Sequence, residues 1–128
     1  MKNSQIALAL LLTSALAGCT SPEQRFRVQA QQMRRRILLS KGSASEPAIT
    51  RTGTAFSATW DVRSDLKPDV LESRLTEILK PDFARTNNET ERLYYAKYND
   101  GESDRIEVTV SPDENHTIAH VRFTIAPD

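Results

Sequence analysis

The chain has 128 residues, of which 38% are hydrophobic, and its 17 basic and 17 acidic side chains give no net charge at pH 7. This length fits one domain, and the single cysteine excludes both an intramolecular disulfide and a zinc site built from several cysteines. The zero net charge hides an uneven distribution of charge along the chain. Residues 19–42 carry six basic side chains and one acid, whereas residues 43–128 carry ten basic side chains and sixteen acids. This asymmetry indicates a basic, surface-interacting tail beside an acidic domain.

The first eighteen residues have the layout of a secretory signal peptide. Lys2 supplies a positive charge, an uncharged apolar run follows at 6–12, and small residues occupy most of 14–18. The apolar run is shorter than the roughly 20 residues that a membrane-spanning helix needs. Leu-Ala-Gly-Cys at residues 16–19 follows directly, and in this motif the chain resembles the lipobox of bacterial lipoproteins.

The resemblance covers only the signal and its cleavage site, and it implies lipidation. Cleavage would fall between Gly18 and Cys19, the Cys19 thiol would receive diacylglycerol, and the new amino group would be acylated with a fatty acid such as palmitate. Thr20 stands where an aspartate retains enteric lipoproteins at the inner membrane, so the resemblance implies an outer-membrane lipoprotein facing the periplasm. The alternative, an ordinary cleaved signal peptide, would leave an unpaired thiol at the start of a secreted protein.

Residues 22–41 predict an amphipathic helix. Pro22 suits its first turn and Gly42 the position just beyond its end. Apolar side chains recur at helical spacing, at Phe26, Ala30, Met33 and Ile37. Three arrangements remain open: the helix lies on an anionic membrane surface, acts as a solvated spacer, or packs its apolar stripe against the domain. The basic residues that would contact the membrane are Arg25, Arg27, Arg34, Arg35 and Arg36.

The segment at 41–53 is small, polar and interrupted by glycine and proline, which predicts a flexible linker or an irregular arm. The folded part should then begin near Thr54. The chain would accordingly divide into a signal peptide at 1–18, a lipidated basic tether with its linker at 19–53, and a small domain at 54–128.

The domain itself predicts one strand, one helix and three further strands. Residues 55–62 alternate between apolar and polar, which indicates a half-buried strand. A helix with one apolar face then ends at Pro81. Strands at 92–98, 105–111 and 116–126 are separated by short turn sequences, which favours an antiparallel meander.

This order predicts an α+β fold in which one helix packs on a mostly antiparallel four-stranded sheet. The domain has no disulfide and few residues, so we expect a small core and a narrow margin of stability. The expected core residues are Trp60, Leu71, Leu75, Ile78, Leu79, Val108, Val121 and Phe123.

No pattern points to catalysis, a metal or another cofactor. His116 and His120 are the only histidines, and on one strand they would lie about 13 Å apart, too far to bind one metal ion together. Residues 99–104 gather oxygen ligands but lack the order of a calcium-binding loop. We also expect no nucleic-acid partner, because an exported compartment offers little nucleic acid.

The sheet face away from the helix is the candidate binding face. If Val121 points into the core, alternate residues of its strand point outward; on the second strand either Tyr94 and Tyr98 or Leu93 and Tyr95 must join them. Tyrosine and arginine are enriched in binding hot spots, although one solvated, mixed face is ordinary for an antiparallel sheet. The candidate residues are Tyr94, Tyr98, Ile118, His120 and Arg122.

Together these features favour a lipid-anchored accessory protein of the cell envelope whose periplasmic domain binds a protein or an envelope polymer without catalysis. Two alternatives stay open. One is an immunity or inhibitor lipoprotein that neutralises a toxin or lytic enzyme, and the other is a small enzyme acting on peptidoglycan or lipid. An enzyme should show a concave pocket where Arg122, His120 or a carboxylate converge, whereas a binding protein should show a flat aromatic face or a free strand edge.

Overall fold

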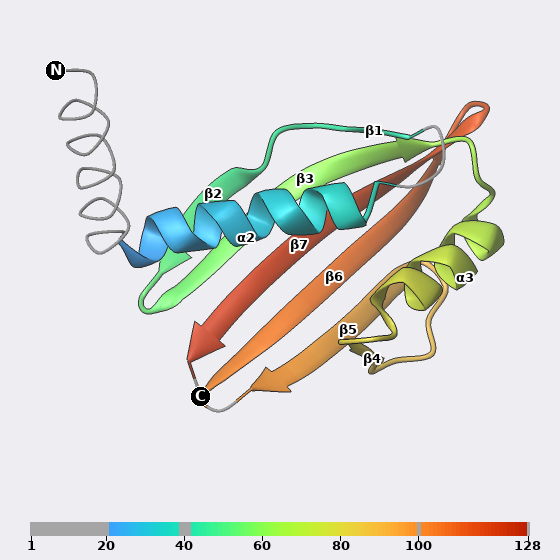
Figure 1. The fold of residues 1–128 in the computed structure, drawn as a ribbon. Coiled ribbons are helices and arrows are strands. Elements are labelled where there is room, and N and C mark those ends of the chain that lie inside the picture. The colour runs from blue at the N-terminus through green and yellow to red at the C-terminus, as the bar shows by residue number, and fades with distance from the viewer. Residues whose placement is uncertain (1–20, 39–41, 100, 128) are drawn as a thin grey trace, which may run out of the picture.

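The computed structural model describes residues 21–38, 42–99 and 101–127, which form two helices and seven strands (Figure 1). The strands make one antiparallel sheet in the order β1-β3-β7-β6-β5-β4, with β2 also paired to β3, and both helices lie on the same face of it. The elements are α2 (Pro22–Arg36), β1 (Ser43–Ala44), β2 (Ala48–Thr52), β3 (Ala55–Ser64), α3 (Pro68–Leu79), β4 (Ala84–Arg85), β5 (Arg92–Asn99), β6 (Glu102–Asp113) and β7 (His116–Pro127).

The α+β class and the packing of helix on sheet are confirmed, but the sheet has seven strands rather than the predicted four. The largest difference lies at 41–53, where we expected a flexible linker. Residues 48–52 instead pair one by one with 55–59 of β3, around a turn at Gly53 whose φ of 62° glycine adopts without strain. An edge strand needs little apolar alternation, so its small and polar composition concealed it.

The helix α2 packs against the sheet, which is the third of the arrangements left open by the sequence. Its apolar stripe is buried, and the ring of Phe26 stacks on the rings of Phe56 and Phe123 with centroids 5.5 and 5.6 Å away. A capping box formed by Ser21 and Gln24 fixes the start of the helix. The folded part therefore begins with α2, and not near Thr54 as we expected.

The helix α3 covers the other half of the same sheet face with Leu71, Leu75 and Leu79, all fully buried. The expected core is confirmed, with Ile78 only partly buried. A hydrogen bond of 2.7 Å between the hydroxyl groups of Thr76 and Tyr95 joins α3 to β5. Burial raises the pKa of the Tyr95 phenol, so this group stays neutral and available for the bond. Within the described residues, neither helix is long and apolar enough to cross a membrane.

Candidate binding face

Alternate residues of β3, β7, β6 and β5 point away from both helices, and no described element covers them. Their neighbours along each strand are buried in the core, so strand alternation fixes their direction. We call this surface the uncovered face. Its side chains are Ser57, Thr59, Asp61 and Arg63 of β3, Ile118, His120, Arg122 and Thr124 of β7, Arg105, Glu107, Thr109 and Ser111 of β6, and Tyr94, Ala96 and Tyr98 of β5.

All five candidate residues from the sequence lie on the uncovered face. The structure also decides between the two tyrosine pairs, because Leu93 and Tyr95 are buried in the core while Tyr98 is 72% exposed. Ile118 and Tyr94 are half-buried among their neighbours. The candidate residues are thus brought to one surface by strand register, with Ile118, His120 and Arg122 on β7 and Tyr94 and Tyr98 on β5.

Polar residues form rows across the uncovered face. In one row Thr59 of β3 stands opposite Arg122 of β7, which stands opposite Glu107 of β6. Opposite charges directly across an antiparallel pair stabilise it modestly. In the next row the hydroxyl groups of Ser57 and Thr124 are 2.9 Å apart and share a hydrogen bond. The face is therefore largely polar and mixed in charge.

An acid–imidazole pair stands on the same face. His120 Nδ1 lies 2.6 Å from Asp61 Oδ1, and both side chains are about half exposed, at 52% and 57%. Thr109 lies across from His120 on β6, but no hydrogen bond joins the two among the described residues. The pair thus resembles the acid and the base of a hydrolytic triad, but no nucleophile among the described residues is hydrogen-bonded to the imidazole. Both side chains are in contact with solvent, where the electrostatic interaction between a carboxylate and an imidazole is weak.

A hollow of about 280 Å³ opens on the uncovered face beside β5. Its floor is Ala96, which stands between Tyr94 and Tyr98 on the same strand face and pairs with Ala84 of β4. Because alanine is small, the two tyrosine side chains project on either side of a gap. Arg105, Glu107 and Thr86 complete the wall. Two aromatic rings, one cation and one carboxylate therefore converge on one depression.

The second histidine lies at the far end of the face and does not join the first. His116 Nδ1 is 3.4 Å from Arg63 Nη2, and the same guanidinium is 3.7 Å from Asp113. Among the residues that the structure describes, no three histidine, cysteine, aspartate or glutamate side chains gather as a metal site would require.

The five basic residues expected at the membrane divide into two groups. Arg34 donates to the carbonyls of Ala44 and Ser45, at 2.6 and 2.8 Å, and Arg36 reaches Asp82 and the Ile78 carbonyl, at 2.6 and 3.1 Å. These two side chains fasten α2 to the rest of the fold. Arg25, Arg27 and Arg35 remain exposed on the surface of the helix. Gly18 and Cys19 lie outside the described residues.

Asp104 is a buried carboxylate that the sequence analysis did not predict. Asp104 is 8% exposed and lines a cavity of about 190 Å³ between α2 and the sheet, and its Oδ1 has no hydrogen-bond partner in the part of the chain that the structure describes. Burial raises the pKa of this carboxyl, the charge of Glu102 raises it further, and Lys97 opposes both. Counting inward positions back along β6 from Ile106 would have found it.

One sheet edge is also open. β2 pairs only with β3 in the described part of the chain, so its other side presents free backbone groups of the kind that accept a partner strand. At β1, by contrast, Arg34 occupies the carbonyls of Ala44 and Ser45.

Comparison with known proteins gives no family. No family model matches the chain, and no curated protein matches it. The crystal structure of CalU16 from Micromonospora echinospora is 12% identical, with a TM-score of 0.46 over 65% of this chain and 69% of that one. The solution NMR structure of CalU16 is 13% identical, with a TM-score of 0.46 over 68% of this chain and 63% of that one. A functional interpretation therefore depends on the site itself.

Proposed function

We propose that this protein is a lipid-anchored accessory protein of the cell envelope that binds a partner through its uncovered face and performs no catalysis. The lipobox at residues 16–19 supports the anchor. The observation that carries the binding role is the hollow at Ala96 with its two flanking tyrosines. Tyrosine is enriched in binding hot spots, and the ring of Tyr98 beside the hollow is 72% exposed.

The geometry favours binding over catalysis. Five hollows on the described part of the chain have volumes between about 190 and 560 Å³, and neither His120 nor Arg122 lines any of them. The candidate acid–imidazole pair is about half exposed, so a substrate bound there would not be shielded from water. The partner is expected to be a protein or an envelope polymer, because a broad polar face with an aromatic hollow presents an extended surface for contact.

The anchor has a direct test. Cys19→Ala removes the thiol that would carry diacylglycerol, so the variant should lose the mass of the acyl groups and move from the membrane fraction to the soluble fraction. Intact-protein mass spectrometry after fractionation measures both. A variant that stays membrane-bound with an unchanged mass would show that no lipid is attached at this position.

The binding role is tested by affinity capture from crosslinked envelopes with the intact lipoprotein as bait. The double variant Tyr94→Ser, Tyr98→Ser should capture much less of the partner than the unaltered protein, because both tyrosine walls of the hollow are removed. The matched control is Val70→Ser, which removes a side chain that is 42% exposed on α3, on the other side of the sheet. Capture that survives the double variant but fails in the control would place the partner on the helical side.

A further inference from the structure

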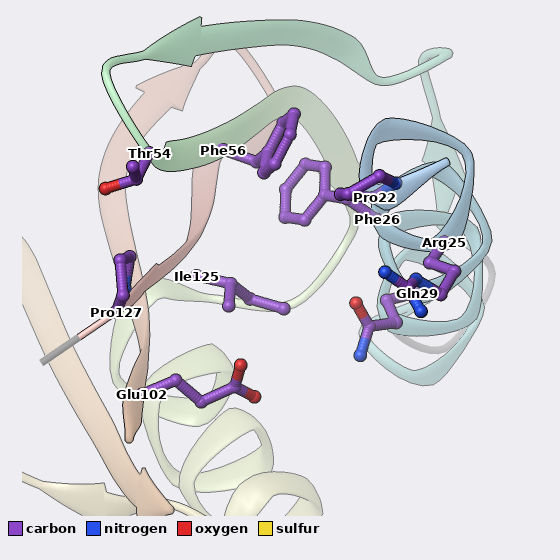
Figure 2. Close-up of a pocket in the computed structure, with 9 residues that line it drawn as sticks. All are labelled: Pro22, Arg25, Phe26, Gln29, Thr54, Phe56, Glu102, Ile125 and Pro127. Atoms are coloured by element: carbon purple, nitrogen blue, oxygen red, sulfur yellow. The ribbon is translucent and has the colours of Figure 1, made fainter. Parts of the chain in front are cut away.

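Four distant parts of the chain meet at one end of the molecule. Pro22 at the start of α2, Thr54 in the turn before β3, Glu102 at the start of β6 and Pro127 at the end of β7 line one hollow of about 330 Å³ (Figure 2). Its apolar side is formed by Phe26, Phe56 and Ile125, and Figure 2 shows the two rings facing each other. We call this the near end, and we call the end with the β6–β7 turn the far end.

The near end is held rigidly to the start of α2. The capping box at Ser21 sets the first turn, and Phe26 is stacked between two core rings. Arg34 and Arg36 bond to β1, to α3 and to Asp82 at the other end of the helix. The helix cannot swing away from the sheet without exposing its buried stripe and breaking these hydrogen bonds.

The chain between the lipid site and this rigid helix is short. Only Thr20 separates Cys19 from Ser21, so even a fully extended backbone spans about 7 Å between them. A flexible tether would let the domain tumble above the bilayer, but a connection of this length holds the near end within a few ångströms of the acylated residue.

We propose that the near end is a membrane-contact surface, which rests on the phospholipid headgroups of the bilayer that holds the acylated Cys19. This inference rests on the lipidation proposed above. In this arrangement α2 does not lie flat on the membrane; the whole domain instead stands on the bilayer with its near end. The hollow at Pro22 then opens towards the headgroups, with Arg25 on its wall.

The distribution of charged side chains fits this orientation, with basic residues at the near end and acidic residues at the far end. At the near end Arg25 and Arg27 lie on the first turns of α2, and Arg51 lies beside the turn at Gly53, with its guanidinium 5.3 Å from the centre of the Phe56 ring. Among the residues that the structure describes, the acids there are Glu102 and Glu23, and Glu23 is 3.4 Å from Arg27. Basic side chains close to an anionic surface are attracted to it.

The far end is acidic by contrast. A hollow of about 560 Å³ there is lined by Lys67 together with Asp69, Glu72 and Glu91, and the β6–β7 turn carries Asp113 and Glu114. Glu72 is paired with Arg85 at 2.8 Å and Asp113 with Arg63 at 3.7 Å, so Asp69, Glu91 and Glu114 carry the unpaired negative charge there among the described residues. Anionic headgroups attract the near end and repel the far end. β7 has 12 residues and is therefore about 40 Å long, so the far end and much of the uncovered face would stand clear of the bilayer and face the periplasm.

The test places one fluorescent label at either end of the full mature lipoprotein. Thr54→Cys marks the near end and Asn115→Cys marks the far end, and both positions are exposed. The natural cysteine carries the lipid, so the introduced thiol alone takes the label. The protein is reconstituted into vesicles of phosphatidylethanolamine and phosphatidylglycerol that contain a lipid with a nitroxide quencher on its headgroup.

We expect quenching several-fold stronger for the label at 54 than for the label at 115. Equal quenching at both positions, or stronger quenching at 115, would overturn the orientation while leaving the anchor intact. Protein that does not float with the vesicles at all would instead overturn lipidation, and the orientation with it. Arg25→Gln combined with Arg51→Gln should weaken quenching at 54, whereas Arg35→Gln, near the other end of α2, should leave it unchanged.

Discussion

The two faces of the sheet are built from the same strands, yet they follow opposite rules. On the covered face Trp60, Val62 and Val121 are at most 2% exposed and pack against α2 and α3. On the uncovered face Asp61 and His120, adjacent in sequence to core residues, stay half exposed. The core is therefore built from one set of alternate residues, and the other set stays at the surface, where we propose that it binds a partner. Substitutions on the two faces should consequently have separable effects.

The largest effect is expected at the point where α2 joins the covered face. Phe26→Ala removes a ring stacked on Phe56 and Phe123, and should lower the free energy of unfolding by about 3–5 kcal/mol in urea titrations. Val28→Ala on the same helix, where the side chain is 57% exposed, should change it by less than about 0.5 kcal/mol. Equal effects of the two substitutions would mean that α2 is not part of the core.

A smaller loss is expected where α2 fastens the sheet edge. Arg34→Ala removes two charge-assisted hydrogen bonds to the carbonyls of Ala44 and Ser45. The free energy of unfolding should fall by about 1–3 kcal/mol, and hydrogen exchange in β1 should accelerate. Arg35→Ala is the matched control, since Arg35 is exposed on the same turn. If the two variants unfold alike, the contacts of Arg34 contribute nothing.

Asp104 is a buried carboxylate on the covered face, and its Oδ1 has no hydrogen-bond partner among the described residues, so its neutral replacement should stabilise the fold. Burial raises the folded-state pKa of this carboxyl above its unfolded value of about 3.9, so the folded state binds the proton more tightly. Burying the charged carboxylate therefore does not destabilise the folded state below about pH 3.9, where the carboxyl is protonated in both states. The destabilisation is complete above the raised folded-state pKa. Asp104→Asn should therefore raise the free energy of unfolding by about 1 kcal/mol near pH 7, and the gain should shrink as the pH falls.

Thermal or urea unfolding of both proteins across this pH range measures that difference. Asp65→Asn, at an exposed position before α3, serves as the control and should change the free energy of unfolding by less than about 0.5 kcal/mol. A stabilisation of Asp104→Asn that grows as the pH falls would contradict the assigned direction of the pKa shift.

The smallest effect on stability is expected on the uncovered face. His120→Ala removes an exposed pair with Asp61, and such pairs contribute only about 0.2–1 kcal/mol. The free energy of unfolding should change by less than about 1 kcal/mol, while partner capture from envelopes should fall. A loss of stability as large as that of Phe26→Ala would show that the uncovered face is structural.

Much of the fold follows from periodicity in the sequence, and the exceptions have physical reasons. Four strands and α3 carry strong patterns, because each must bury one face. β2 was missed because an edge strand with exposed residues such as Thr50 and Arg51 needs no such pattern. The docking of α2 stayed open because a narrow apolar stripe in a basic helix satisfies a membrane, solvent or the sheet equally well.

The candidate face was predictable only in part. Alternation placed Ile118, His120 and Arg122 together on β7, but it could not choose between the tyrosines, because both faces of β5 carry apolar residues at that point. The hollow brings Ala96 of β5 together with Arg105 and Glu107 of β6, and strand register rather than any local pattern sets these neighbours.

Site-specific photo-crosslinking tests most directly whether the uncovered face binds the partner. A benzophenone amino acid replaces Arg122 on the uncovered face or Arg74 on the exposed side of α3, in otherwise intact lipoprotein in living cells. We predict one discrete crosslinked species from position 122 and none from position 74. The same species from both positions, or a species from position 74 alone, would contradict the assignment of the binding face.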